Sequence, residues 1–532
     1  MFPWLTALIA WPLVAALATL LAGRRRLPGS AAGARIVALA GALVQVGLLV
    51  GAFVAFDASA AGEIQLVEQH EWIPALGASY AVGVSGVGLL LIALSVVLVP
   101  LVLLAEWRTQ RTQHSDEQSR AYAATVLVLA SFMVAVFAAR DLFLFYVVFE
   151  AMLIPACLLI GAFGAGVARR RAAIKFLIFS LTGGLVMLVG VIALYFQLPE
   201  GARGADAFLL SSLAEAAPSL GQTPGRLIFL AFFIAFAIKA PLFPVHTWLP
   251  DAVENATPGT STLLVGVMDK AGTFGMLAIC LPLFPEAARW AAPVVVWLAV
   301  ASILYGAILA IGQSDVLRLI GYTSISHFGF MVLGIFTFTE VGTAGASLMM
   351  VGHGLSVGAM FLVAGFAIAR HPSRSRAIAG YGGLRQVAPV LGGVFLVAAL
   401  SAASLPGLAT FVPELLVLIG AFGANSAAVV VAVPAVVLAA VYALWTYQRM
   451  FLGEPSAEVA GIVGLPEGAG VAGAGAAAHV ASAQSGDLDG RERAVASALI
   501  GLLLLLGVAP ALGLRYVNGP AAAISSLMEV EP

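Results

Sequence analysis

Long apolar runs constrain this chain more than any other feature of its sequence. About fourteen of them approach or exceed 20 residues, the length that an α-helix needs to cross the hydrocarbon of a bilayer. The 532 residues are 61% hydrophobic and only 10% charged, so a soluble fold would lack the polar surface that water must hydrate. The sequence therefore predicts an all-α polytopic membrane protein.

Each run predicts one membrane helix, because a helix satisfies its own backbone polar groups in lipid. The predicted spans lie near residues 2–22, 34–56, 81–105, 121–139, 141–165, 172–197, 226–249, 258–282, 292–311, 315–337, 341–369, 389–421, 428–452 and 494–514. Residues 138–141 and 337–340 predict tight helical hairpins. Because its arginines follow the first run instead of preceding it, that run predicts a span and no signal peptide.

The loop cations alternate from side to side when the spans are counted with the N-terminus outside. The cytoplasmic side then receives Arg24–Arg26, Arg35, Arg108, Arg111, Arg120, Arg169–Arg171, Lys175, Arg318, Arg370, Arg374, Arg376, Arg385, Arg449, Arg491 and Arg493. The opposite side receives Arg140, Arg203, Arg226, Arg289 and Arg515. Cationic loops stay in the cytoplasm, which predicts that both the N-terminus and the C-terminus face the exterior.

Charge and cysteine content narrow the possible functions. The net charge of −1 leaves no basic face for nucleic acid. The two cysteines, Cys157 and Cys280, stand alone in apolar runs and form no metal-binding spacing. We therefore expect no metal site and no iron–sulfur cluster in this chain.

One stretch, residues 226–275, combines apolar runs with buried charge. Lys239 lies inside a span directly before Pro241, and Lys270 lies at a similar depth in the next span. A lysine in hydrocarbon costs on the order of 3 kcal/mol or more by insertion scales. Two of them, one beside a helix break, predict an ion path.

Four more ionisable residues fall within the predicted spans: Glu150, His327, His353 and Glu414. A proton relay requires groups of this kind, which gain and lose protons away from lipid. Taken singly, a buried histidine is more often a satisfied core residue, and a buried glutamate can simply pair with a structural cation. Six such groups in one apolar domain favour a proton pathway through Glu150, Lys239, Lys270, His327, His353 and Glu414.

Prolines interrupt the seventh and twelfth spans, at residues 239–244 and at 405–413. The breaks lie five spans apart, which predicts two inverted five-helix repeats, helices 4–8 and 9–13, each broken in its fourth helix. Proline kinks alone would be the simpler explanation. The predicted division is 1–115 for helices 1–3, 116–285 and 286–452 for the repeats, 453–493 for a flexible cytoplasmic loop rich in Gly and Ala, and 494–532 for the last helix and tail.

The remaining polar residues have simpler interpretations. Asp251 and Glu254, after the seventh span, are expected to be solvated or to cap a helix, with a role in proton entry as the alternative. Asp141 is expected to lie at the N-terminus of a helix, where its charge is favourable. Arg169–Arg171 reads as an orientation signal.

Several motifs together resemble a known family. FYVVFEAMLIP, KAPLFPVHTWLPDA, LLVGVMDKAGTFG, YTSISHFGFMVLG and VGHGLS are similar to the antiporter-like subunits of proton-pumping NADH:quinone oxidoreductase, respiratory complex I. The resemblance covers roughly helices 4–13. It is closest to the M type of these subunits, since Glu414 stands where the L and N types are expected to carry lysine.

The resemblance implies a proton-translocating subunit in a bacterial cytoplasmic membrane. Glu150 and Lys239 would interact as a pair, Lys270 would be the central lysine, His327 and His353 would connect, and Glu414 would release protons. Other subunits of the complex would hold NADH, FMN, iron–sulfur clusters and quinone, so this chain would bind no cofactor. Its partners would be the L-type and N-type subunits and the small membrane-arm subunits.

This sequence departs from the family at two positions. Asp269 precedes Lys270 where the family usually has an apolar residue, and Val253 stands where histidine is common. Neighbouring residues on a helix face differently, so Asp269 could point away from Lys270. The alternatives to the complex I assignment are an Mrp-type cation/proton antiporter subunit, a membrane hydrogenase subunit, and a structural subunit whose buried charges stay paired.

Overall fold

The computed structural model describes residues 2–22, 30–108, 115–199, 203–204, 206–462 and 486–529. In that part of the chain, 12 helices are long and apolar enough to cross a membrane. Two shorter apolar helices, α19 (Pro389–Ala402) and α20 (Phe411–Ala424), form the halves of one broken span. The bent pair α25 (Gly490–Val508) and α26 (Ala511–Met528) supplies a further span, so the predicted all-α architecture with about fourteen spans is confirmed.

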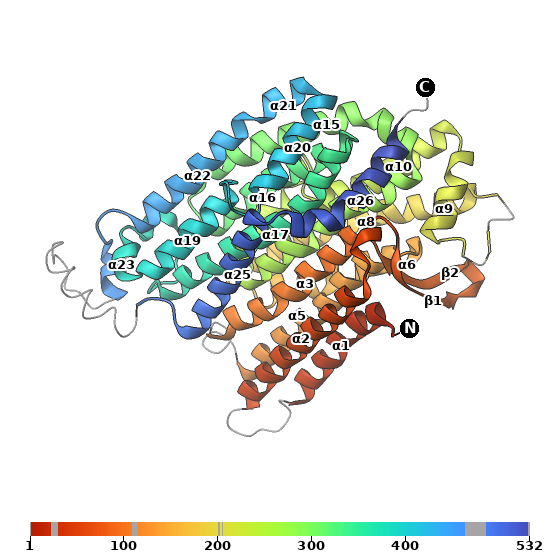
Figure 1. Ribbon diagram of the computed structural model, residues 1–532. Helices are drawn as coiled ribbons and strands as arrows, with labels where there is room; N and C mark the ends of the chain where they lie inside the picture. Colours follow the sequence, from red (N-terminus) through yellow and green to blue (C-terminus); the bar gives the residue numbers. More distant parts are fainter. Residues whose placement is uncertain are drawn as a thin grey trace.

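Helices α1 (Trp4–Ala22) and α2 (Ser30–Ala55) lie at one edge of the bundle (Figure 1). Helix α3 (Gly86–Ala105) lies further inside, and most of its residues are buried. The third span was predicted to begin near residue 81, which is wrong. Residues 57–84 instead form η1 (Ala58–Ala60), β1 (Gln65–Ile73), η2 (Pro74–Leu76) and β2 (Ala78–Val84), with the strands paired antiparallel. Gly77 turns this hairpin at φ +72°, and a Cβ there would lie 1.7 Å from the Gly204 carbonyl oxygen.

The first repeat follows, and its fourth span is broken. Its elements are α5 (Asp116–Ala138), α6 (Leu142–Ala151), α7 (Leu153–Gly161), α8 (Arg169–Gln197), α9 (Leu210–Ala216), η4 (Ala217–Ser219), α10 (Gln222–Lys239), α11 (Trp248–Asn255), α12 (Pro258–Leu263), η5 (Leu264–Met268), α13 (Lys270–Gly275), η6 (Met276–Cys280) and α14 (Leu281–Leu283). In the seventh span the helix breaks after Lys239, within the predicted break, and helical structure resumes in α11. The segments η5 and η6 are π-helical turns on either side of Lys270.

The second repeat begins at the opposite end of the bundle from the first. Its elements are α15 (Pro285–Ile311), α16 (Val316–Phe336), α17 (Glu340–Arg370), η7 (Ile378–Gly380), α18 (Leu384–Val387), α19, α20, α21 (Ser426–Ala432) and α22 (Pro434–Phe451). The break between α19 and α20 lies in its fourth span, as predicted. In the predicted flexible loop, residues 453–462, which include α23 (Ala457–Ile462), and residues 486–493 are described, while residues 463–485 lie outside the described part of the chain.

Side-chain caps explain why the predicted hairpins turn so tightly. Asp141 Oδ1 accepts a hydrogen bond of 2.8 Å from the Leu144 amide at the start of α6, which confirms the predicted N-terminal placement. Thr339 caps α17 in the same way, through the Gly342 amide. Such caps satisfy amides that a helix start leaves without a partner.

The two sets of loops gather at opposite ends of the helices. Both termini and the β-hairpin lie at one end, whereas α23 lies at the other (Figure 1). Bridges between Val82 and Ala139 and between Asp141 and Leu209 join loops of the first end. The pair of Arg370 and Glu492 joins loops of the second. The alternation used to assign the loops therefore holds in the structure.

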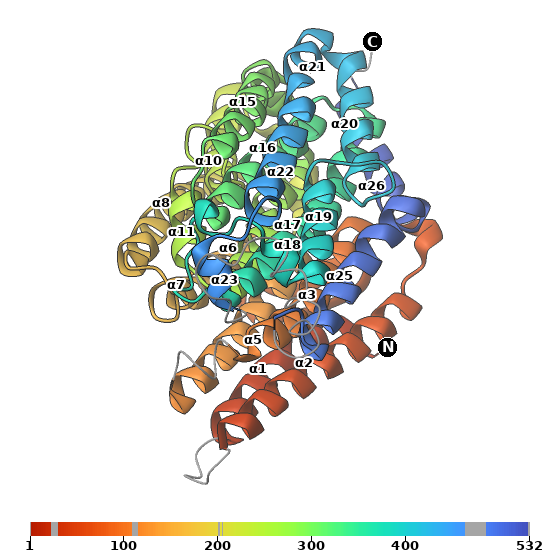
Figure 2. The same ribbon diagram turned by 90° about the vertical axis from the view of Figure 1, so that its left-hand side faces the viewer.

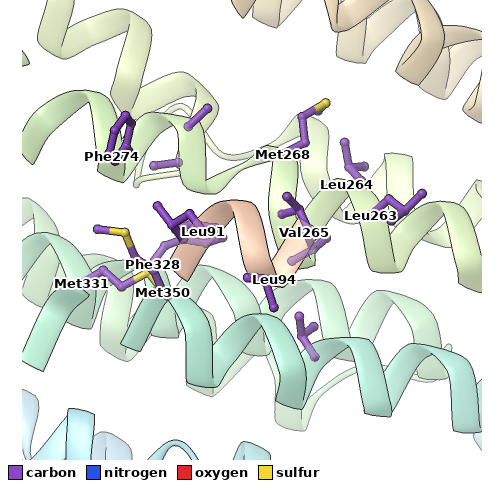
Figure 3. Close-up of a cluster of buried hydrophobic side chains, with 14 of the residues drawn as sticks. Leu91, Leu94, Leu263, Leu264, Val265, Met268, Phe274, Phe328, Met331 and Met350 are labelled. Atoms are coloured by element: carbon purple, nitrogen blue, oxygen red, sulfur yellow. The ribbon is translucent and has the colours of Figure 1, made fainter. Parts of the chain in front are cut away.

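Apolar side chains hold the central helices together. Leu91 and Leu94 of α3 lie among Val265 and Met268 of η5 and Met350 of α17, with further side chains from α16 (Figure 3). Helices within a membrane associate mainly through such close packing, since lipid is as apolar as the side chains. Figure 2 shows α16 and α17 inside the bundle and α22 outside them. The core thus fixes the helix that carries Lys270.

Candidate functional site: a buried charged axis

The axis begins at Glu150, on α6. Its carboxylate lies directly against the backbone of α8, where a Cβ built on Gly184 would come within 1.8 Å of Glu150 Oε1. Glycine at position 184 therefore makes room for the carboxylate between the two helices. Within the described residues, Glu150 Oε1 is buried and has no hydrogen-bond partner.

Lys239 is the last residue of α10 and is only 1% exposed. Its ammonium lies 5.1 Å from the centre of the Phe149 ring, close enough for a cation–π interaction. The Glu150 carboxylate acts on it electrostatically. Across the described residues, Lys239 Nζ makes no hydrogen bond, so rings and nearby carboxylates stabilise the charge without a direct ion pair.

The break after Lys239 follows from Pro241, which has no amide hydrogen to continue the helix. The Leu242 amide bonds to the Ala237 carbonyl instead, at 2.9 Å. The Ile238 carbonyl would then be left alone, but the Trp248 indole donates to it at 3.0 Å. Protein groups thus replace the lost helical bonds, as a membrane interior requires.

Lys270 is fully buried in the next span. Its Nζ donates to the Val265 carbonyl at 2.6 Å and lies 2.8 Å from His353 Nδ1. The carbonyl is accessible because η5 is a π-helical turn, and such turns shift the backbone bonding pattern by one residue. When Lys270 is charged it can only donate, so in that state His353 Nδ1 accepts and the ring proton lies on Nε2. The Phe328 ring centre lies 4.8 Å from Nζ.

Two histidines continue the axis towards the second broken helix. The rings of His353 and His327 lie 5.0 Å apart between centres. The backbone of Ala402, the last residue of α19, lies beside the His327 ring. The histidines therefore connect Lys270 to the break between α19 and α20.

Glu414 lies in the first turn of α20, just past this break, and is buried. Its Oε2 accepts a hydrogen bond of 2.5 Å from the Ser404 hydroxyl. Gly407 turns the break at φ +90°, a conformation that favours glycine. The Tyr442 hydroxyl donates to the Ala402 carbonyl at 3.2 Å, so the freed backbone again finds a side-chain partner.

The six predicted residues lie one after another along the axis, and the contacts between neighbouring residues differ. Lys270 and His353 touch, and the two histidines lie ring to ring. Glu150 and Lys239 interact only at a distance. Among the described residues, no hydrogen bond or ion pair joins Glu414 to either histidine, and the backbone of the break lies between them.

Sequence reasoning missed several groups on this axis. Ser404 and Tyr442 contribute hydroxyls at the second break, and the Val265 carbonyl contributes an acceptor. Their type is too common in membrane helices to signal a site. Asp269 was noticed only as a departure, although an acidic residue inside an apolar span is itself a signal.

Asp251 and Glu254 are partly exposed, as expected, but both are also ion-paired, which the sequence did not indicate. Both accept from Arg318 Nη1 at 2.7 Å, and Lys175 Nζ lies 2.6 Å from Asp251 Oδ2. Burial opposes ionisation of Asp251, but the bonds from Lys175 and Arg318 outweigh it and lower the pKa of its carboxyl. Asp315 caps α16 through the Arg318 amide and so helps to hold this arginine beside α11.

These features define a class of protein. It is a membrane-embedded helical bundle with two broken helices, in which a buried series of acidic, basic and histidine side chains can exchange protons. Over the described residues, no group of three or more His, Cys, Asp and Glu is placed to hold a metal ion.

Comparison with known proteins identifies the family. The sequence profile described as NADH:quinone oxidoreductase/Mrp antiporter, TM matches residues 139–439. The chain is 44% identical to NADH-quinone oxidoreductase subunit M of Mycobacterium tuberculosis, over 97% of this chain and 93% of that protein. It is 35% identical to the subunit of the same name from Rhodobacter capsulatus, over 96% and 94%.

Solved structures agree. A chain of respiratory complex I from Thermus thermophilus with bound NADH matches with a TM-score of 0.84 at 30% identity, covering 99% of this chain and 100% of that one. A chain of the Mrp complex from Dietzia sp. matches with a TM-score of 0.80 at 23% identity, covering 99% and 100%, which shows a shared fold. This chain therefore belongs to the NADH:quinone oxidoreductase/Mrp antiporter transmembrane family.

Proposed function

We propose that this chain is the M-type, proton-translocating subunit of a respiratory NADH:quinone oxidoreductase. The observation that carries the proposal is the buried axis from Glu150 to Glu414, in which side chains that bind protons follow one another through the middle of the bundle. Its relatives named subunit M, aligned over nearly the whole chain, support the assignment to complex I.

The proposed pumping cycle uses the six residues in order. A change passed along the membrane arm separates Glu150 from Lys239, which then loses a counter-charge and releases its proton more easily. The proton moves to Lys270 and through the histidine pair, where the 2.8 Å contact between Lys270 and His353 is short enough for direct transfer. Glu414 then releases it on the far side.

The redox chemistry is assigned to other subunits. In this proposal NADH, FMN, iron–sulfur clusters and quinone belong to the rest of the complex, and this chain contributes the translocase step alone. Its partners are the L-type and N-type subunits and the small membrane-arm subunits. We further propose a bacterial cytoplasmic membrane, with both termini outside, and functional units at 116–285 and 286–452 that carry one half of the path each.

Two substitutions test the proposal. Lys239→Ala or Glu150→Ala, in membranes that contain the whole complex, should abolish or strongly reduce proton pumping while the complex still assembles. The matched control is Glu340→Gln, since Glu340 is exposed at the start of α17 and should leave pumping unchanged. Unchanged pumping in the Lys239 and Glu150 variants would contradict the relay.

Copurification from native membranes tests the assignment to complex I. Co-migration with subunits that oxidise NADH and reduce quinone is the expected result. Co-migration with other antiporter subunits and sodium-dependent transport would place the chain in the Mrp branch, and co-migration with a hydrogenase would place it in that branch. In either case the charged axis would keep its role.

A further inference from the structure

Asp269 lies between the two buried lysines, and the proton path described above does not use it. Its side chain is 0% exposed. Within the described residues, neither carboxylate oxygen has a hydrogen-bond partner. A buried charged group without hydrogen-bond partners is strongly destabilising, so its presence in the middle of the bundle requires a cause.

The helix geometry shows which way Asp269 faces. Asp269 and Gly272 are three residues apart, and residues at that spacing share a helix face. Gly272 packs on the end of α10, where an added Cβ would lie 2.5 Å from the Phe236 carbonyl oxygen and 2.7 Å from the Ala240 amide nitrogen. Asp269 therefore lies on the face turned towards the end of α10, where Lys239 is.

Lys270 uses a different face of the same helix. It reaches His353 and the Phe328 ring, which belong to α17 and α16. The neighbours Asp269 and Lys270 thus lie on different faces of the helix. Asp269 lies on the side of the first half of the axis, and Lys270 lies on the side of the second half. The Asp269 and Lys270 charges nevertheless interact.

The electrostatics place Asp269 in the series. Its carboxylate interacts with both Lys239 and Lys270. Glu150 acts on Lys239 from the other side of the series. Charges therefore alternate along the axis, from Glu150 to Lys239, Asp269 and Lys270, and this alternation offsets the desolvation of each group.

We propose that Asp269 is a proton carrier between Lys239 and Lys270. This inference rests on the proposed function of the axis. When Glu150 moves away, the Lys239 ammonium gives its proton to the Asp269 carboxylate through hydrogen-bonded water, leaving a neutral amine and a carboxylic acid. The acid then gives the proton to a neutral Lys270, which becomes an ammonium while Asp269 returns to the carboxylate. One proton moves two steps, and no other reactant is consumed.

The alternative role is that of a fixed counter-ion. A fixed counter-ion would stay ionised throughout turnover, whereas a carrier becomes a carboxylic acid once per proton. Loss of activity on removing the carboxyl would fit both roles. Infrared difference spectra distinguish them, because only a protonated carboxyl gives a carboxylic-acid carbonyl band.

The experiment compares Asp269→Asn and Asp269→Glu in the assembled complex. We expect Asp269→Asn to slow pumping by at least about tenfold, the smaller end of what a proton-transfer group contributes. Asp269→Glu should restore most of it. A carboxylic-acid band should appear in wild-type spectra during NADH turnover, vanish in the Asn variant and shift in the Glu variant. If the Asn variant fails to assemble, the shifted band of the Glu variant decides the question.

Two results would overturn the inference. One is pumping by Asp269→Asn at the wild-type rate. The other is a turnover spectrum with no carboxylic-acid band that the substitutions at 269 change. The variant Lys270→Ala, measured in parallel, shows which proposal has failed when Asp269→Asn pumps normally. If Lys270→Ala also pumps normally, the proposed relay is wrong. If Lys270→Ala stops pumping, only the proposed role of Asp269 is wrong.

Discussion

Substituting alanine for Gly184 would displace Glu150 without touching any ionisable residue. A Cβ at position 184 would lie 1.8 Å from Glu150 Oε1 and 2.2 Å from its Cδ, whereas ordinary contact begins at 3.4 Å. The carboxylate must therefore retreat by about 1.6 Å, the gap between these contact distances. It sits at the end of a flexible side chain, so rotation relieves the clash at about 1 kcal/mol.

The expected functional effect is much larger than the effect on stability. A misplacement of roughly 1 Å can slow a positioned proton transfer or reaction step by about a hundredfold, so pumping by Gly184→Ala should fall by a factor of about ten to a hundred. The assay is the initial rate of acidification of inverted membrane vesicles, divided by the rate of NADH oxidation. Assembly and thermal unfolding of the complex should stay close to wild type.

The matched control is Gly225→Ala, because a Cβ at Gly225 meets nothing within 4 Å. It adds the same methyl group to a membrane helix without moving a charged side chain. If Gly184→Ala and Gly225→Ala pump equally well, the position of Glu150 does not govern transport, and its assignment as the first group of the relay is refuted.

Three further substitutions test what holds the fold. Arg370→Ala should lower the free energy of unfolding by about 3 kcal/mol, because it leaves the buried Glu492 carboxylate without the partner now 2.5 Å away. Trp248→Phe should cost about 1–3 kcal/mol, since the Ile238 carbonyl loses its only observed donor among the described residues. The pKa of Asp251 is lowered in the fold, so its pairs stabilise the protein above pH 3.8 and this contribution is lost as the pH falls further; Asp251→Asn should remove that dependence.

Thermal or chemical unfolding of the detergent-purified protein measures all three, with pH as the variable for the last. Arg493→Ala is the control for Arg370→Ala, because Arg493 is exposed on the same helix as Glu492 and should change the stability little. An equal loss of stability in both arginine variants would mean that the buried pair is not the cause. A stability curve for Asp251→Asn that follows wild type in acid would contradict the pH argument.

The membrane spans could be predicted because their cause is local. Lipid offers no hydrogen bonds, so every long apolar run must become a helix wherever it lies in the fold. Prolines at 241 and 406 predicted both breaks for the same reason, since a missing amide interrupts a helix in any surroundings. The capped hairpin at Asp141 followed from residues that are adjacent in the chain.

Other features depended on distant residues, and the predictions for them were wrong or incomplete. The run before Gly86 is apolar enough for a helix, but pairing with β1 makes it a strand. The helix α26 was not expected beyond the last predicted span. Asp251 and Glu254 looked solvated because nothing local marks Arg318, dozens of residues away, as their partner.

The sequence alone determined which groups can carry protons and that they lie within the membrane. Only the tertiary structure decided which of them meet. Lys270 contacts His353 because packing between separate helices brings the two side chains together, and Gly272 lets the helix of Asp269 approach the end of α10 closely. The apolar composition of a segment determines that it is buried in the membrane. The proximity of two side chains arises instead from packing between helices that are far apart in the chain.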